Sequence, residues 1–468
     1  MRMSTIGTLE NPLRVAVVGC GPSGFYIAQG LLQSPGLVSR VDMFDRLPTP
    51  YGLVRYGVAP DHQKVKGVTK VYAKIATDPA VRWFGNVELG RDLTMDDLKK
   101  HYHAIAFTTG AQTDRRLDVP GEDLVGSHPA TEFVAWYNGH PRYRDYKFDL
   151  SCERAVVIGV GNVAIDVARI LCRTPEELAK TDIADYALEA LKKSRVKEVY
   201  LVGRRGPAQA AFTNSEIEEA GELADADAIT LPDEVALDDI SKADLAAHPD
   251  RQTSDKVTFL QGYAAPKATP KAKKLFIRFL LSPTEIQGNA AGHVTGVKLV
   301  RNQLQLGKDG SVKARATDKF EDVPCGLVFR SVGYRGVALD GVPFREDWGT
   351  IPNEAGRVVD LATKAPVRGM YVAGWIKRGP SGVIGTNRPC ALESVKCLVE
   401  DLKNGAVLAP TANAADGIPA LLASRGVKPL DFSDWTKLDT MEVAKGTAAG
   451  RPRVKFVSLE QMNAALGK

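Results

Sequence analysis

Residues 15–24 read VAVVGCGPSG, an apolar run that leads into three glycines spaced as G-x-G-x-x-G. The apolar run predicts a strand and the residues from Phe25 to Gln33 predict a helix, so the glycines occupy the turn between them. In such a turn Gly19 allows the tight bend, Gly21 lets a pyrophosphate approach the backbone, and Gly24 lets the helix lie close to the strand. The unpaired N–H groups at the start of the helix favour phosphate. This context predicts a dinucleotide site.

A second strand ends in an acidic residue where such a site requires one. Residues 41–45 read VDMFD, and Asp45 follows Gly19 by 26 positions. A carboxylate at this point accepts hydrogen bonds from the ribose hydroxyls of an adenosine. The first site is therefore predicted to bind an unphosphorylated adenosine.

A second turn of the same kind follows about 140 residues later, and the strand that comes after it ends in residues of the opposite charge. Residues 155–164 read AVVIGVGNVA, and the strand at 196–203 runs into Arg204 and Arg205 instead of an acid. Two guanidinium groups can hold a 2′-phosphate through bidentate hydrogen bonds, which favours NADP(H) over NAD(H). Two sites of opposite preference predict FAD in the first and NADP in the second.

Three more short apolar stretches end in small residues, and they complete the predicted fold. They are HAIAFTTG at 103–110, GLVFRSVG at 326–333 and MYVAG at 370–374. Continuous apolar runs without alternation are typical of parallel strands that helices cover on both faces. We therefore predict an α/β protein with two Rossmann-like dinucleotide-binding domains.

The composition is that of a globular protein, with 468 residues, 44% hydrophobic and 25% charged. The net charge of +5 is too weak over this length to indicate a nucleic-acid partner. No apolar run reaches the roughly 18 residues of a membrane span. The first strand begins by Arg14 without room for a cleavable signal, so we expect a soluble intracellular protein. The six cysteines form no C-x-x-C pair, which argues against a zinc ribbon or a dithiol redox centre, and we expect no metal site.

Two charged stretches lie in the middle of the chain. Residues 216–250 are rich in acids and alanine and predict a solvated helix with surface loops. Residues 265–274, APKATPKAKK, carry four lysines and no acid. This segment predicts either a flexible hairpin tip kept soluble by lysine or a docking patch for an acidic partner.

With these motifs in order, the chain resembles the adrenodoxin-reductase-like ferredoxin–NADP reductases, which are FAD enzymes of the glutathione-reductase-like two-dinucleotide-domain class. The resemblance extends from about Pro12 to the C-terminus. It rests on VGCGPSGFY at 18–26, PYGLVRYGVAPDH at 50–62, GNVAIDVAR at 161–169, GRRGPAQAAFT at 203–213 and AGWIKRGPSGVIGTN at 373–387.

The resemblance implies that the NADP domain, residues 111–334, is inserted into a discontinuous FAD domain, residues 1–110 and 335–468. FAD is implied at Gly19, Gly21, Ser23, Gly24, Asp45, Leu53, Leu89 (on a strand beside the adenine), Trp375, Gly382, Val383 and Ile384. NADP is implied at Val160, Gly161, Asn162, Val163, Arg204, Arg205, Glu216 and Gly382, and the catalytic residues are His62 and Glu216. Two positions depart from the family pattern: Asp45 replaces a commoner glutamate, and Val160 replaces a residue that is often polar, which leaves only backbone contact there.

The implied activity is that of a ferredoxin–NADP⁺ reductase: hydride transfer between NADP(H) and FAD, then one-electron transfers between FAD and a ferredoxin-type iron–sulfur protein. A helix that begins near Gly382 would direct N–H groups at the flavin. Acidic partners require a basic surface, for which the candidates are Arg55, Lys64, Lys66, Lys70, Arg378 and the lysines of residues 267–274. We expect a monomer, and a bacterial cytoplasm rather than a mitochondrial matrix.

Other classes of protein share these two modules. A flavin disulfide reductase needs a redox-active cysteine pair. A glutamate-synthase-type small subunit adds an N-terminal cysteine-rich segment, whereas only Cys20 precedes Cys152 here. A flavin monooxygenase and a regulatory protein that binds NADP without turnover remain open alternatives.

Overall fold

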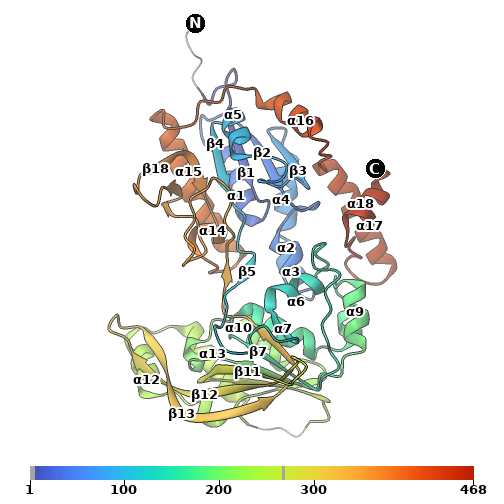
Figure 1. Cartoon of the computed structure of the whole chain (residues 1–468), viewed down its shortest axis with the longest axis vertical. Coiled ribbons are helices and arrows are strands. Elements are labelled where there is room, and N and C mark those ends of the chain that lie inside the picture. Colours follow the sequence, from blue (N-terminus) through green and yellow to red (C-terminus); the bar gives the residue numbers. More distant parts are fainter. Residues whose placement is uncertain (1–5, 266–268) are drawn as a thin grey trace.

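The first of two large sheets is parallel except at its β16-β17-β18 edge, and it combines strands from both ends of the chain. The computed structural model describes residues 6–265 and 269–468 (Figure 1). Seven strands follow the order β16-β17-β18-β4-β1-β2-β3, with bounds β1 (Leu13–Val18), β2 (Ser39–Asp45), β3 (Val81–Gly85), β4 (Ala104–Phe107), β16 (Asn353–Glu354), β17 (Arg357–Val359) and β18 (Pro366–Val372). Because β18 pairs in parallel with β4, the late chain completes a sheet that the early chain begins. The predicted insertion of one module into the other is confirmed.

The second sheet has six strands in the order β6-β14-β7-β8-β10-β9, and every pairing in it is parallel. Its strands are β6 (Ser127–Pro129), β7 (Arg154–Ile158), β8 (Glu198–Val202), β9 (Ala226–Ile229), β10 (Lys273–Arg278) and β14 (Leu327–Arg330). The apolar runs around the two glycine turns thus form buried parallel strands, as predicted.

Helices cover these sheets. In the first unit they are α1 (Pro22–Leu32), α2 (Leu53–Tyr56), α3 (Gln63–Lys66), α4 (Thr69–Ala76), α5 (Met95–His101), α14 (Trp375–Arg378), α15 (Asn387–Lys403), α16 (Ala414–Ser424), α17 (Phe432–Ala448) and α18 (Leu459–Leu466), with a short 3-10 turn η2 (Ile384–Thr386). In the second they are α6 (Ala130–Tyr137), α7 (Asn162–Cys172), α8 (Pro175–Leu178), α9 (Asp185–Lys192), α10 (Asn214–Gly221), α11 (Pro232–Val235), α12 (Asp239–Ala247) and α13 (Arg251–Gly262), with η1 (Pro207–Gln209). Within the described residues, every helix is too short or too polar to cross a bilayer.

An antiparallel sheet that the sequence did not predict covers the second unit. It comprises β11 (Leu281–Gly288), β12 (Val294–Leu306) and β13 (Val312–Pro324). Leu281, Ile286 and Val297 pack against Val156 and Val202 of the parallel sheet. One face of that sheet is therefore covered by strands, while α7 and α9 cover the other.

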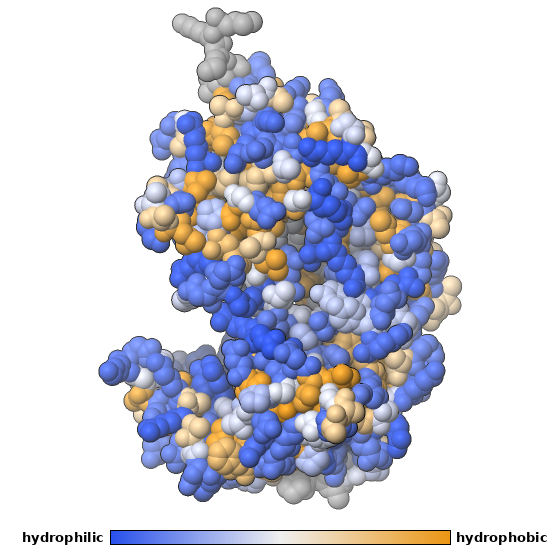
Figure 2. Space-filling view, viewed as in Figure 1, coloured by the Kyte–Doolittle hydropathy of each residue, from blue (hydrophilic) through white to orange (hydrophobic). Residues whose placement is uncertain are grey.

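The chain passes between the two units through a narrow ribbon. β5 (Thr113–Asp114) pairs antiparallel with β15 (Tyr334–Arg335). We propose domain boundaries at 110/111 and 334/335, because both lie at this ribbon. The units lie one above the other in Figure 1, and Figure 2 shows an indentation between them that is bordered by hydrophilic residues.

Candidate functional site

The first glycine turn leaves an open space in front of helix α1. Gly19 has φ +99°, and a Cβ there would lie 2.7 Å from the carbonyl oxygen of Thr108. At Gly24 a Cβ would overlap the carbonyl oxygen of Gly19. Gly21, in contrast, has φ −83°, and the nearest atom to a Cβ would be 4.0 Å away. Since no side chain caps α1, its first N–H groups face this space, and they suit a pyrophosphate.

Ser23 and Asp45 tie this turn to distant parts of the unit. The Ser23 hydroxyl donates to Oδ1 of Asn387, the first residue of α15, at 3.2 Å. The Asp45 carboxylate accepts the N–H groups of Cys20 and Leu47, each at 2.9 Å. Each carboxylate oxygen keeps a second lone pair, so the shorter acid can still accept a ribose hydroxyl.

We expect the Asp45 carboxyl to make flavin retention sensitive to pH. Burial raises its pKa from 3.8 to about 6, because the two backbone N–H donors offset only part of the cost of burying the charge. Ribose hydroxyls would donate to the ionised form of Asp45, so we expect FAD affinity to fall as the pH decreases through about 6. We expect a larger dissociation constant for FAD at about pH 5 than at about pH 8, measured by flavin fluorescence.

Asp45→Asn is the control for this expectation. Its amide cannot ionise, so the variant should bind FAD weakly at both pH values. An unchanged pH dependence in Asp45→Asn would assign the effect to another group.

The other residues implied for FAD lie in loops and at helix starts of the first unit, and one prediction needs a correction. Leu53 begins α2 and Val383 precedes η2, and their exposures of 38% and 52% are high for apolar side chains. Trp375 begins α14, and its Nε1 donates to the Ser381 carbonyl at 3.1 Å. Leu89 was predicted on a strand, which is wrong: β3 ends at Gly85, and Leu89 forms only an isolated bridge to Leu93 in the loop that follows.

The segment around Gly382 approaches the first glycine turn. Gly382 has φ +76°, Ile384 begins η2, and α15 follows directly at Asn387. A Cβ at Gly374 would overlap the Ser23 hydroxyl, so this late glycine allows close contact with the start of α1. The helix predicted near Gly382 is present, and its N-terminus lies next to Ser23 through Asn387.

The second glycine turn has the same form in the other unit. Gly161 precedes α7, which no side chain caps, and nothing lies within 4 Å of a Cβ built at Gly161. The carbonyl of Val160 accepts the N–H groups of Ala211 and Phe212, at 2.9 and 3.1 Å. Asn162 accepts the N–H of Thr213 at 2.9 Å, and Val163 follows it in the first turn of α7. The turn and the loop after β8 are thus joined.

Arg204 and Arg205 stand at the end of β8 beside this turn. Arg204 is exposed and Arg205 half-buried. Within residues 6–265 and 269–468, no carboxylate forms an ion pair with either guanidinium. Burial, and then the charge of Arg204, lower the pKa of Arg205. Two unpaired cations at this point fit a 2′-phosphate.

His62 and Glu216 meet between the units. His62 precedes α3 of the first unit, and Glu216 lies in the first turn of α10 in the second. Nδ1 of His62 is 3.7 Å from Oε1 of Glu216 and 3.9 Å from Oδ1 of Asp166. Burial, and then the charge of Asp166, raise the pKa of Glu216 well above its usual range.

Sequence reasoning missed the centre of this cluster, the fully buried guanidinium of Arg169. This guanidinium donates hydrogen bonds to Asp61 and Asp166. It also lies 3.6 Å from the carboxylate of Glu216 and 3.2 Å from that of Glu219. The available signal was an Asp and an Arg three positions apart in an otherwise apolar helix. The carboxylates and His62 are close enough together to suggest a metal site, but Arg169 already supplies the positive charge.

The predicted basic residues separate into buried and exposed groups. Arg55 is buried and forms a bidentate pair with Glu442 at 2.6 and 2.9 Å, and Lys66 donates to Asp182 at 2.7 Å. Arg378 is held by Ser381 and Thr386, each at 3.0 Å. Lys64 and Lys70 are exposed, and Lys267 lies outside the described residues.

The lysine-rich stretch is not a hairpin tip, because it connects a helix, α13, to a parallel strand, β10. Lys271 and Lys273 donate to the main-chain carbonyls of Leu223 and Leu171, at 2.7 and 2.9 Å. These contacts hold both ammonium groups against the protein, so they do not form a free patch. The acidic stretch that begins at Glu216 does form helices and loops, as predicted.

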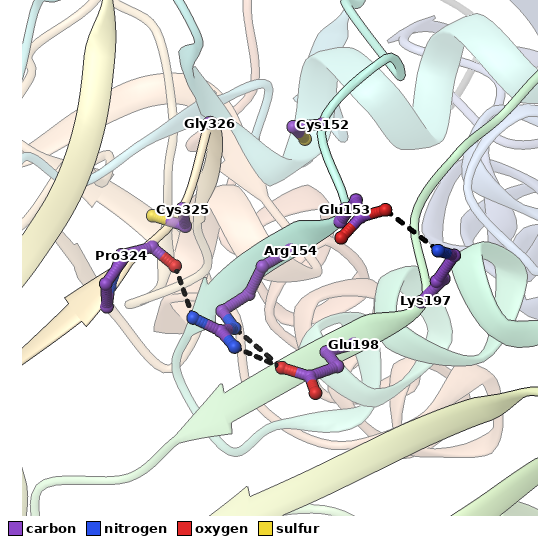
Figure 3. A pocket seen from close by; sticks show the side chains of 8 residues that line it. All are labelled: Cys152, Glu153, Arg154, Lys197, Glu198, Pro324, Cys325 and Gly326. Carbon is purple, nitrogen blue, oxygen red and sulfur yellow. Dashed lines mark hydrogen bonds and ion pairs between the residues drawn. The ribbon is translucent and has the colours of Figure 1, made fainter.

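A cavity of about 340 Å³ lies at the N-terminal ends of β7 and β8, away from the glycine turn that follows β7 (Figure 3). Its charges are paired internally: Arg154 with Glu198 at 2.7 Å and Lys197 with Glu153 at 2.8 Å. Burial raises the pKa of its Cys325 thiol to about 12. Since the glycine turn follows the other end of β7, this cavity is separate from the nucleotide site.

Comparisons with known proteins agree with this geometry. Residues 13–222 match the family described as pyridine nucleotide-disulphide oxidoreductase. The chain is 45% identical to NADPH-ferredoxin reductase FprA of Mycobacterium tuberculosis over 96% of this chain and 98% of that protein. It is 43% identical to human mitochondrial NADPH:adrenodoxin oxidoreductase, over 98% and 93%. The solved structure of M. tuberculosis FprA in complex with NADPH superimposes with a TM-score of 0.91 at 45% identity, over 98% of this chain and all of that one.

Proposed function

The chain belongs to the family of ferredoxin–NADP reductases that includes FprA and adrenodoxin reductase, and we propose that it catalyses their reaction. FAD, when bound, accepts hydride from NADPH and releases single electrons, so it couples a two-electron donor to a one-electron iron–sulfur acceptor. One observation carries the proposal: two uncapped helix N-termini face open glycine turns, and at the second turn the adjoining strand ends in Arg204 and Arg205, for which the described residues supply no carboxylate partner.

The residues of the chain have separate tasks in this reaction. We propose that the start of α1 and Asp45 hold the pyrophosphate and ribose of FAD, while Leu53 and Val383 provide apolar contact. The start of α7 would hold the pyrophosphate of NADP, with Arg204 and Arg205 at its 2′-phosphate. His62 and Glu216 come from different units, so they can order the nicotinamide only where the units meet.

We propose that an acidic ferredoxin docks on the exposed face of α3 and α4. Lys64, Lys70 and Lys74 are exposed there, together with Val65 and Val71, which are 49% and 42% exposed. None of the three lysines forms an ion pair within the part of the chain that the structure describes. This face directly follows His62, so its positive charge lies next to the proposed reaction site.

NADPH-driven cytochrome c reduction with a panel of ferredoxins tests the activity. We expect a yellow protein that NADPH bleaches without oxygen, and a strong stimulation of cytochrome c reduction by an acidic ferredoxin. This stimulation should fall steeply as the ionic strength rises, because charge steers the encounter. A colourless protein that does not oxidise NADPH would reject the reductase assignment.

The docking face is tested by charge reversal. Lys64→Glu/Lys70→Glu should lower the ferredoxin-dependent rate at low salt by about tenfold or more, while NADPH-driven ferricyanide reduction stays unchanged. Lys308→Glu/Lys319→Glu, with Lys308 in the turn between β12 and β13 and Lys319 on β13, is the control of equal charge change. Equal losses in both variants would place the partner elsewhere.

We also propose a bacterial cytoplasmic enzyme that works as a monomer. The mycobacterial source of the FprA relatives supports the first part. Sedimentation of the flavin-loaded protein tests the second, with a mass near 50.5 kDa expected.

A further inference from the structure

The main chain of residues 203–205, which carries both arginines at the end of β8, is held by the antiparallel sheet. Its three successive carbonyl oxygens each accept a hydrogen bond. In chain order, the donors are the N–H of Leu281 at 3.0 Å, Nδ2 of Asn302 at 2.9 Å and the N–H of Leu280 at 3.1 Å. These donors belong to the start of β11, the turn before it, and β12. The only side chain among them is that of Asn302.

Asn302 is a polar residue where the pattern of β12 places apolar ones. It is 3% exposed and lies between the inward-facing Val300 and Leu304, which are 3% and 8% exposed. A main-chain carbonyl can only accept a hydrogen bond, so the amide presents Nδ2 to Arg204. The same Nδ2 donates to the Ser282 hydroxyl at 2.8 Å, so both amide protons have acceptors. The pairing of β12 with β13 shifts register between Val300 and Asn302, and such bulges often redirect a side chain.

The turn that precedes β11 has an unusual conformation. Leu280 has φ +58°, a left-handed value that a leucine rarely adopts. Its N–H donates to the Arg205 carbonyl, and its own carbonyl accepts the N–H of Asn302 at 2.7 Å. Leu280 and Asn302 are therefore bonded both to the arginine pair and to each other. Strained residues of this kind persist where the surrounding structure holds them, and they cluster at binding sites.

The hydrogen bond from Asn302 fixes the peptide plane between the two arginines. The carbonyl of Arg204 and the N–H of Arg205 belong to one planar unit. Holding this carbonyl limits rotation about ψ of Arg204 and φ of Arg205, and these two angles set the directions of the side chains relative to each other. Two guanidiniums that bind one phosphate gain affinity when these directions are set before the ligand arrives.

We propose that Asn302 is a positioning residue for NADP specificity, which holds the Arg204 carbonyl so that both guanidiniums reach one 2′-phosphate. Because its side chain is buried beneath the main chain that it holds, Asn302 acts through the arginines and not by contact with the nucleotide. It rests on the proposed function only in that the 2′-phosphate of NADP is placed at Arg204 and Arg205.

The test is the binding of two small nucleotides to the flavin-loaded protein, measured by calorimetry. Adenosine 2′,5′-bisphosphate carries the 2′-phosphate, and 5′-AMP lacks it. Asn302→Leu keeps the size of the side chain but removes both donors, so we expect the preference for the bisphosphate to fall by about tenfold. The affinity for 5′-AMP should stay within about twofold, because this ligand lacks the group that the arginines bind. KM for NADPH should rise in Asn302→Leu while kcat stays unchanged.

Two further variants separate positioning from support of the fold. Asn302→Thr gives a second measurement if the leucine variant does not fold, because its hydroxyl is one bond shorter than the amide and should show the same loss. Thr317→Val, on β13, is the matched control. Thr317 donates to the Arg301 carbonyl at 2.8 Å within the same sheet, so its loss should leave the preference for the bisphosphate unchanged.

An unchanged preference in the Asn302 variants, or an equal loss of affinity for both nucleotides, would overturn the proposed role of Asn302. The same loss of preference in Thr317→Val would also overturn it, since any weakening of the sheet would then suffice. Binding needs no turnover. A wild type that prefers the bisphosphate but is not reduced by NADPH would therefore reject the proposed reaction and leave the role of Asn302 standing.

Discussion

Gly21→Ala is expected to give a folded protein that has lost FAD. The φ of −83° at Gly21 suits any residue, and a Cβ would meet no protein atom closer than 4.0 Å. That Cβ enters the space in front of α1 where the pyrophosphate would lie. Loss of about two charge-assisted hydrogen bonds weakens binding by about 10²- to 10⁴-fold. The flavin absorbance of the purified protein measures its FAD content, and circular dichroism measures its folding.

The control is a glycine of similar surroundings away from both turns. Gly262, at the end of α13, has nothing within 4 Å of a built Cβ, so Gly262→Ala should retain FAD fully. Gly24→Ala should instead impair folding, because its Cβ would overlap the Gly19 carbonyl. A yellow Gly21→Ala protein with normal FAD content would exclude a pyrophosphate at α1.

Arg204→Ala/Arg205→Ala is expected to raise KM for NADPH by about 100-fold, with kcat within about twofold of wild type. The two guanidiniums contact only the 2′-phosphate in our proposal, far from the reacting atoms. NADH lacks this phosphate, so its kcat/KM should change little and the preference for NADPH should collapse. Steady-state kinetics with both nucleotides and ferricyanide measure this.

Arg195→Ala is a control for the loss of positive charge away from the nucleotide turn. Arg195 is exposed and precedes β8, at the opposite end of the strand from Arg204. Its loss removes one positive charge from the same unit but none from the nucleotide turn. An equal rise in KM for NADPH and NADH in the double variant would show that Arg204 and Arg205 support the turn rather than the phosphate.

The local motifs could be predicted from sequence because their chemistry is local. A glycine turn, the strand before it and the helix after it occupy about twenty adjacent residues, and φ values of +99° at Gly19 and +132° at Gly159 require glycine. The opposite charges of Asp45 and Arg204 are equally local, since each follows directly from a buried strand. The discontinuous sheet was also predicted, because the late glycine segment resembles one that returns to the flavin.

Predictions failed where the answer depended on distant residues. The resemblance implied that Leu89 lies on a strand, but β3 ends at Gly85, which forms a bridge to Leu430. Arg55 and Lys66 were candidates for a basic docking surface. Instead they form ion pairs with Glu442 and Asp182, which are each more than 100 residues away in the chain. A charge shows in the sequence, whereas its partner does not.

The sequence by itself determined the two glycine turns, the opposite charges of the residues that end the strands beside them, and the order of the modules. The tertiary structure alone decided the cluster at the junction, where Asp61, His62, Asp166, Arg169, Glu216 and Glu219 come together from three separate segments. Burial there raises the pKa of Glu216, and the packing brings both Glu219 and Arg169 within 2.8 Å of Nε2 of His62. Such coupling acts over a few ångströms of space, and no pattern along the chain records which residues will be that close.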